Sequence, residues 1–102
     1  MKVLISNQAH KDIDSIFKYI SRDSLKYANE TSENIYSRIS ELEMLPYIGR
    51  YVPELEDKCY RELMYKNYRI IYSISDKKNT IYIRFVIHDK RNFKLFYKLK
   101  WR

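Results

Sequence analysis

The fold of this chain is decided by residues 60–88, which read YRELMYKNYRIIYSISDKKNTIYIRFVIH. Apolar and polar positions alternate in three runs, each rich in β-branched and aromatic residues: 59–65, 68–75 and 80–87. Such alternation is typical of half-buried antiparallel strands. The two polar connections between the runs, 66–67 and 76–79, have the length of hairpin loops. The sequence therefore predicts a three-stranded meander.

Pairing Tyr65 with Tyr68 and Ser75 with Thr80 puts residues that lie opposite one another on the same face of this meander. One face is apolar and is the predicted core face: Leu63, Ile70, Tyr72, Ile74, Ile81, Ile83, Phe85 and Ile87. The other face carries two arginines in mid-sheet and a histidine at its rim: Glu62, Met64, Arg69, Ile71, Ser73, Tyr82, Arg84, Val86 and His88. Two interpretations of the second face stay open. It binds an anion, or it is an ordinary solvated face with an arginine paired to Glu62.

The chain of 102 residues is long enough for one hydrophobic core, so a single domain, 1–102, is expected. Its net charge of +7 is unevenly distributed along the sequence. Residues 1–58 hold 8 basic and 10 acidic residues, whereas residues 59–102 hold 12 basic and 3 acidic ones. The positive half suits a polyanion such as nucleic acid or the ribosome, or an acidic protein partner.

Several classes of protein are disfavoured by the sequence. The single Cys59 cannot form an internal disulfide and is expected to be a small buried strand residue. Without a disulfide framework or a signal peptide, the expected location is the cytoplasm. No apolar run reaches membrane-spanning length, so no membrane association is expected. His10 and His88 lie far apart in sequence without partner ligands, so neither a metal site nor a cofactor is expected.

Two helices are predicted before the meander. Residues 2–5 form a short apolar strand, and Ser6 or Asn7 can cap a helix that ends near 21–23. A second helix is predicted over 25–45, where Pro46 stops it. The short link between them makes an antiparallel hairpin that needs the core face of the sheet as its partner. The predicted fold class is α+β, with the N-terminal strand and the helical hairpin packed on one face of a small antiparallel β-sheet.

Two segments have less regular patterns. Residues 46–58 form a predicted loop in which Gly49 takes a backbone conformation that other residues resist. The tail, 88–102, interleaves basic and aromatic residues and suits either a strand or a short irregular helix. Its aromatic side chains either seal the sheet edge or stack on single-stranded nucleic acid beside the basic ones.

The order of elements, β-α-α-β-β-β, is accompanied by short motifs at matching places. They are Ala9-x-x-Asp12-Ile13-x-x-Ile16-x-x-Tyr19-Ile20, Leu45-Pro46-x-x-Gly49-Arg50-x-Val52-Pro53-Glu54-Leu55, Tyr60-Arg61-Glu62-Leu63, Tyr68-Arg69-Ile70-Ile71-Tyr72 and Val86-Ile87-His88-x-x-Arg91. Together they cover residues 1–92, and the chain resembles the RelE/ParE superfamily of toxins from type II toxin–antitoxin modules. No single motif is specific, and the resemblance rests on their joint order.

The resemblance implies one of two activities. RelE-like members cut mRNA in the ribosomal A site, whereas ParE-like members inhibit DNA gyrase and lack a nuclease site. The hairpin and the loop around Gly49 are more ParE-like, and the basic tail with Arg91 and Tyr97 favours RNA. Growth arrest by ribosome-dependent mRNA cleavage is the expected function. Gyrase inhibition, or a non-toxic remnant that only binds an antitoxin, is the alternative.

For a nuclease, the resemblance implies roles for individual residues. Phosphate-clamping arginines fall on Arg69 and Arg91, and proton transfer falls on Tyr97 or His88. Further phosphate-binding positions are basic: Arg61, Lys66, Arg84, Lys90 and Lys94. Such chemistry needs a base, an acid and cations around the phosphorane, and it needs no metal. A tyrosine acts as a base near pH 7 only where nearby cations lower its pKa.

Each role has a structural alternative. Arg69 can pair with Glu62, His88 can bond at a strand end, and Tyr97 can pack within the tail. Strict alternation places Arg61 on the core face, away from the other arginines, unless a bulge intervenes. Arg50 and Glu54 are expected to fix the loop rather than to react.

The resemblance also implies partners. A cognate antitoxin, acidic in its toxin-binding segment, is expected to fold over the helical hairpin or the basic face. The other expected partners are the ribosome and mRNA for a nuclease, or DNA gyrase for the alternative.

Overall fold

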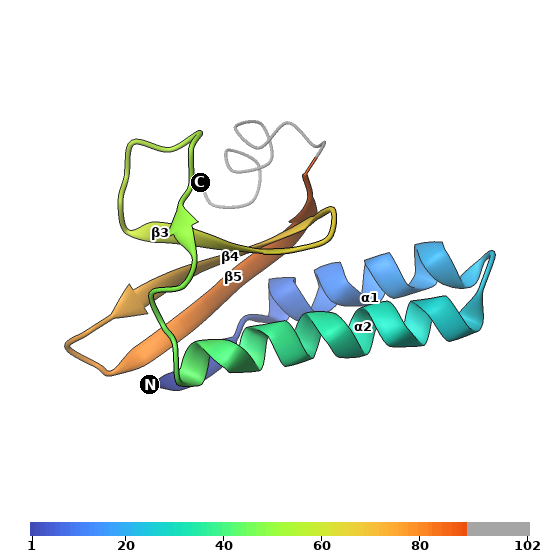
Figure 1. The fold of residues 1–102 in the computed structure, drawn as a ribbon, viewed down its shortest axis with the longest axis horizontal. Helices are drawn as coiled ribbons and strands as arrows, with labels where there is room; N and C mark the ends of the chain where they lie inside the picture. Colours follow the sequence, from blue (N-terminus) through green and yellow to red (C-terminus); the bar gives the residue numbers. More distant parts are fainter. Residues whose placement is uncertain (90–102) are drawn as a thin grey trace.

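A computed structural model describes residues 1–89 (Figure 1). Its elements are β1 (Lys2–Ile5), α1 (Asn7–Ser21), α2 (Leu25–Ser40), a 3-10 turn η1 (Glu41–Glu43), β2 (Arg50–Tyr51), β3 (Tyr60–Tyr65), β4 (Tyr68–Ser75) and β5 (Thr80–His88). Four of the predicted site residues lie outside the described part of the chain: Lys90, Arg91, Lys94 and Tyr97.

Side-chain caps begin both helices. The hydroxyl of Ser6 accepts a hydrogen bond from the Ala9 amide at 3.0 Å, and Ser24 accepts one from Tyr27 at 3.0 Å. The end of α1 agrees with the prediction. In contrast, α2 ends at Ser40 and tightens into η1, five residues before the predicted end. A closing 3-10 turn satisfies the last carbonyls of a helix before a proline, here Pro46, prevents its continuation.

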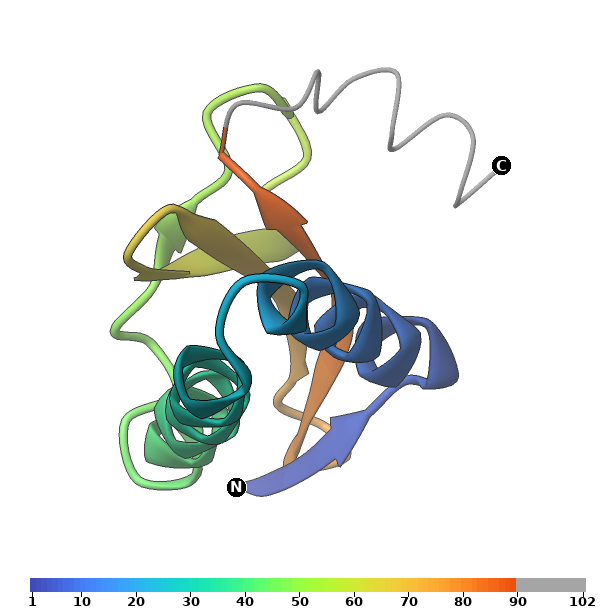
Figure 2. The ribbon, with the colours of Figure 1, turned by 90° about the vertical axis from the view of Figure 1, so that its right-hand side faces the viewer.

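The sheet has five strands in the order β1-β5-β4-β3-β2. Helices α1 and α2 pack side by side against one face of it, which confirms the predicted α+β class (Figure 2). Two details were not predicted. Strand β1 runs parallel to β5, and the loop contributes a short edge strand, β2, antiparallel to β3.

The predicted register of the meander is correct at both hairpins, where Tyr65 lies opposite Tyr68 and Ser75 opposite Thr80. A bulge interrupts the pairing of β4 with β5, because Ile71 lies opposite Phe85 whereas its neighbour Tyr72 lies opposite Ile83. One extra residue on β5, Arg84, turns every later side chain of that strand to the other face.

The face prediction for the end of β5 is therefore wrong. Phe85 and Ile87 were expected on the helix-covered face, but they pack with Val52 and Ile71 on the opposite face. Val86 was expected on the opposite face and is instead buried in the core beneath the helices. The predicted rim residue His88 lies across from Tyr68, on the helix side of the sheet.

Each face of the sheet thus has its own core. The larger core lies under the helices: Ala9, Ile13, Ile35, Ile39, Leu42, Leu63, Ile70, Tyr72, Ile81, Ile83 and Val86. The smaller one lies under the loop that follows β2: Val52, Ile71, Phe85 and Ile87, with Leu55 and Tyr60 packed against them. The loop after β2 consequently covers part of the second face of the sheet.

Two single-residue expectations are corrected. Gly49 has no positive φ. Glycine is required there by space, since a Cβ would lie 2.5 Å from both the Glu62 carbonyl oxygen and the Tyr72 hydroxyl. Cys59 is exposed rather than buried, because it lies one residue before β3 in a turn where its amide donates to Asp57.

Candidate functional site

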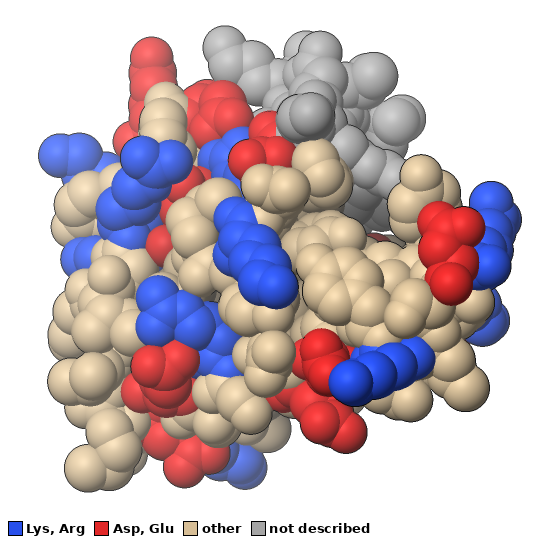
Figure 3. Space-filling view, turned by 45° about the vertical axis from the view of Figure 1, so that its right-hand side comes forward, with Lys and Arg blue, Asp and Glu red and all other residues tan. Residues whose placement is uncertain are grey.

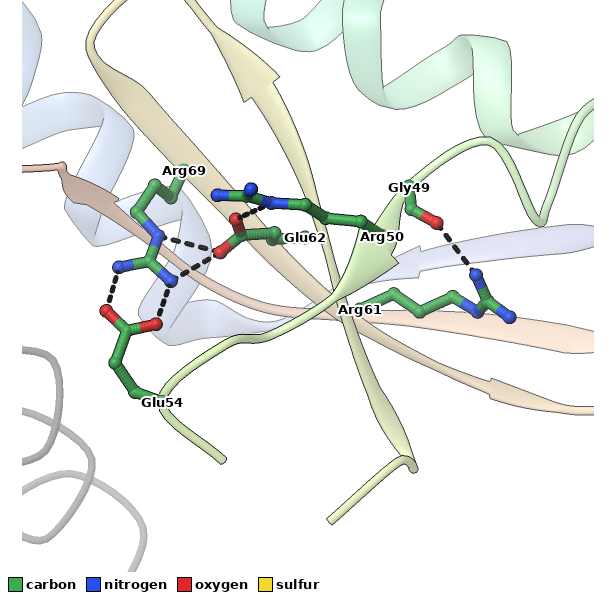
Figure 4. A network of polar contacts seen from close by, with 6 residues as sticks. All are labelled: Gly49, Arg50, Glu54, Arg61, Glu62 and Arg69. Atoms are coloured by element: carbon green, nitrogen blue, oxygen red, sulfur yellow. Dashed lines mark hydrogen bonds and ion pairs between the residues drawn. The ribbon is translucent and has the colours of Figure 1, made fainter. Parts of the chain in front are cut away.

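The loop-covered face of the sheet holds a chain of alternating charges, Arg50, Glu62, Arg69 and Glu54, called here the Arg–Glu ladder (Figure 4). The Arg69 guanidinium donates to Glu54 through both terminal nitrogens, at 2.6 and 2.7 Å. Its Nε donates to Glu62 Oε1 at 2.7 Å, and Nη2 donates to the same oxygen. Arg50 Nε donates to the other oxygen, Glu62 Oε2, at 2.6 Å.

The burial of Glu62 and Arg69 explains why each is surrounded by groups of opposite charge. The side chains of Glu62 and Arg69 are 0% and 6% exposed, whereas that of Glu54 is 33% exposed. A buried carboxylate is tolerated only where charged donors replace its water, and here two guanidinium groups do so. The ladder has two positive and two negative groups, so it carries no net charge.

The ladder also fixes protonation states. The hydrogen bond from Arg69 holds the pKa of Glu54 below its usual range. The same contact, followed by those to Glu62, raises the pKa of Arg69. Arg69 thus stays charged and cannot act as a proton-transfer group. To bind Arg69, a phosphate group would have to displace the carboxylates that already bind this guanidinium through paired hydrogen bonds.

The structure separates the other predicted site residues. Arg61 lies on the opposite face from Arg69, where its Nη1 donates to the Gly49 carbonyl at 2.7 Å (Figure 4). His88 also lies on the helix side, next to Asp89 at 3.2 Å. Among the described residues, the predicted proton-transfer group and the predicted clamp are therefore divided by the sheet.

Two remaining candidates lie at other places. Lys66 occupies the turn between β3 and β4, with its Nζ 5.2 Å from the centre of the Tyr27 ring. Arg84 is the bulge residue, and its Nε donates to Ser73 at 3.1 Å. Neither contacts the ladder through an interaction identified within residues 1–89. The face drawn in Figure 3 shows basic and acidic side chains interspersed, without one large positive patch.

A groove that was not predicted runs along α1, with a volume of about 530 Å³. It is lined by one side of the helix and by the ends of β4 and β5: Gln8, Lys11, Asp12, Ser15, Ile16, Lys18, Tyr19, Arg22, Tyr68, Val86, Ile87 and His88. Four of these residues are cations or a histidine, and one is acidic. Basic residues on one side of the first predicted helix were the available signal, but only the bulge in β5 brings His88 beside them.

Comparison with known proteins identifies the family. The model for the "ParE toxin of type II toxin-antitoxin system, parDE" matches residues 3–93. The chain belongs to the ParE toxin family. It is thus a toxin of a type II toxin–antitoxin system, as the resemblance to the RelE/ParE superfamily implied. None of the curated proteins compared with this ParE-family chain matches it.

Solved structures share the fold of this toxin at low sequence identity. The chromosomal ParDE system of P. aeruginosa matches at 18% identity with a TM-score of 0.72, covering 86% of this chain and 95% of that one. The toxin–antitoxin complex RelBE2 of Mycobacterium tuberculosis matches at 19% identity with a TM-score of 0.61, covering 85% of this chain and 95% of that one. The isolated E. coli RelE toxin matches at 15% identity with a TM-score of 0.62, covering 97% of this chain and 95% of that one.

Neither α1 nor α2 has the length and apolar character that a membrane span requires. Within residues 1–89, no group of three or more histidine, cysteine, aspartate or glutamate side chains is placed to hold a metal ion.

Proposed function

We propose that this toxin arrests growth by binding DNA gyrase, as the ParE-like branch of the superfamily does, and not by cutting RNA. The observation that carries the proposal is the state of Arg69. A nuclease of the RelE type needs this guanidinium at the scissile phosphate, but here it is buried and bound to Glu54 and Glu62. The match of residues 3–93 to the ParE model supports the same branch.

Ribosome-dependent mRNA cleavage is the competing function. Within residues 1–89, two residues that it needs are not placed for cleavage. The predicted clamp Arg69 is bound in the ladder, and the predicted proton-transfer residue His88 lies on the other face of the sheet. Its remaining support is the sequence of the tail, where Arg91, Tyr97 and the lysines Lys90 and Lys94 interleave with aromatic residues. Those roles stay predictions.

We propose a cognate antitoxin as the second partner, with its toxin-binding segment in the groove along α1. Lys11 and Arg22 line this groove without an identified carboxylate partner among residues 1–89, and Tyr19 and Tyr68 add aromatic surface. An acidic amphipathic segment fits that chemistry. Its association is expected to slow as salt is added, because charge steering is screened.

Two assays run on one toxin preparation test the proposed function. The first follows supercoiling of relaxed plasmid by gyrase, and the second follows primer extension on a transcript in a purified translation system. The proposal predicts blocked supercoiling and an intact transcript. Cleaved transcript together with normal supercoiling would establish the nuclease instead.

A further inference from the structure

A second surface of the toxin is built around Arg61, at the β2 edge of the sheet. Large apolar side chains are exposed over one short segment: Met44, Leu45, Tyr47, Ile48 and Tyr51, called here the 44–51 patch. Met44 alone is 85% exposed. Five of the nine large hydrophobic residues found exposed within residues 1–89 lie in this segment. Exposed apolar residues that gather in this way mark contact surfaces.

Arg61 lies between two of these side chains. Its guanidinium carbon is 4.4 Å from the centre of the Tyr51 ring and 5.2 Å from that of Tyr47. Lys58 Nζ is 5.6 Å from the Tyr51 ring. Stacking on tyrosine orients the guanidinium plane without neutralising its charge. No carboxylate within 4.0 Å of Arg61 or Lys58 is identified in the described structure, so the two cations can pair with carboxylates of another molecule.

The segment that carries the patch is held in place before any partner arrives. The Tyr72 hydroxyl accepts from the Gly49 amide at 3.0 Å and donates to the Pro46 carbonyl at 3.0 Å. Arg61 binds the Gly49 carbonyl, and the Tyr47 hydroxyl donates to Asp76. A surface that is already ordered loses little conformational entropy on binding, which favours affinity.

The side chains of the 44–51 patch themselves are exposed and contribute little to either core. Tyrosine, methionine and arginine are the residue types enriched where protein interfaces are strongest. The patch shares no residue with the groove along α1, so an antitoxin segment that fills the groove leaves the patch accessible.

We propose that the 44–51 patch, with Arg61 and Lys58, is the surface by which the toxin binds its target enzyme. The partner surface is apolar at its centre and presents carboxylates to the two cations. This inference rests on the proposed function, in which the target is DNA gyrase. It assigns target and antitoxin to different surfaces of the toxin.

The test uses full-length toxin freed from its antitoxin and two pairs of matched variants. Met44→Asp and Lys58→Glu change the patch, while Leu25→Asp and Lys26→Glu make the same kinds of change at the exposed start of α2. The affinities for immobilised gyrase and for the antitoxin are measured for each. The patch variants are expected to bind gyrase about tenfold more weakly and the antitoxin as wild type does. The α2 variants are expected to bind gyrase normally.

Three results would overturn the inference. If wild-type toxin binds gyrase and the patch variants bind it equally well, the patch is not the target surface, although the proposed function survives. If wild-type toxin does not bind gyrase, the proposed function fails together with the inference. If the patch variants lose affinity for the antitoxin, or lose self-association in sedimentation, the occupant of the patch is the antitoxin or a second toxin molecule.

Discussion

Arg61 and Arg69 lie on neighbouring strands of one sheet, and the structure puts them in opposite situations. Arg69 is buried under the loop after β2, with both carboxylates of the ladder bound to it. Arg61 lies on the other face, stacked between tyrosines and hydrogen-bonded only to a backbone carbonyl by the contacts identified. The first arginine is part of the interior, whereas the second is only half-buried.

The difference teaches which arginine is available for function. A guanidinium that compensates a buried carboxylate is part of the interior, and its removal leaves an uncompensated charge. A guanidinium held by aromatic rings keeps its charge for another molecule. In this toxin the predicted clamp Arg69 is structural, whereas Arg61, on the core face where strict alternation placed it, belongs to the proposed binding surface.

The largest expected effect is a contrast between Arg69→Met and Arg61→Met. Methionine keeps most of the side-chain volume in both cases, so the comparison isolates the charge. Arg69→Met strands the buried Glu62 carboxylate and is expected to lower the free energy of unfolding by about 3–5 kcal/mol. Arg61→Met removes half-buried stacking and the hydrogen bond to the Gly49 carbonyl, and it is expected to cost about 1–2 kcal/mol. Urea unfolding of the purified variants measures both. Equal losses would remove the distinction between the two arginines.

A smaller effect is expected for Gly49→Ala, which affects the support of the 44–51 patch. The new Cβ would lie 2.5 Å from the Glu62 carbonyl oxygen and the Tyr72 hydroxyl, so the segment must shift. The expected loss in the free energy of unfolding is about 1–3 kcal/mol, the usual cost of overpacking. Gyrase affinity should fall with it while antitoxin affinity stays unchanged. Normal stability and normal gyrase affinity would show that the close approach at Gly49 is unimportant.

The smallest expected effect concerns pH and the exposed end of the ladder. Arg69 lowers the pKa of Glu54 in the folded state, so the unfolded chain binds more protons in this range. The stability that Glu54 contributes is present above about pH 4.3, the ordinary glutamate pKa, and is lost as pH falls through the lower folded value. Because Glu54 is partly exposed, the contribution is about 1 kcal/mol or less.

The matched variant for this prediction is Glu54→Gln, which removes the titrating group. Urea unfolding at pH 7 should show wild type to be the more stable protein, and the difference should shrink at pH 3. A difference that is the same at both pH values would assign the effect to packing rather than to charge.

Much of this architecture could be predicted from the sequence, because local patterns determine it. Alternation over 60–88 gave the meander and both hairpin registers, and the cap predicted at Ser6 or Asn7 gave the start of the first helix. The bulge could not be predicted, since Arg84 is an ordinary strand residue until it is paired across the sheet. That single residue exchanged the faces of Phe85, Val86 and His88.

The site was less predictable, because its contacts join segments that are distant in sequence. Pairing of Arg69 with Glu62 was one of the open alternatives, and Glu54 was expected to fix the loop. Their meeting at one guanidinium depends on the loop returning over the second face. The stacking of Arg61 required β2, which has only two residues and no alternating pattern of its own.

The central claim, that this toxin acts by binding gyrase rather than by cutting RNA, is tested most directly in a reaction without ribosomes. Such a reaction contains gyrase, relaxed plasmid, ATP and purified toxin that is shown to arrest growth when expressed. The account predicts that the plasmid stays relaxed once the toxin equals the gyrase in concentration. Complete supercoiling in the presence of excess toxin would contradict it.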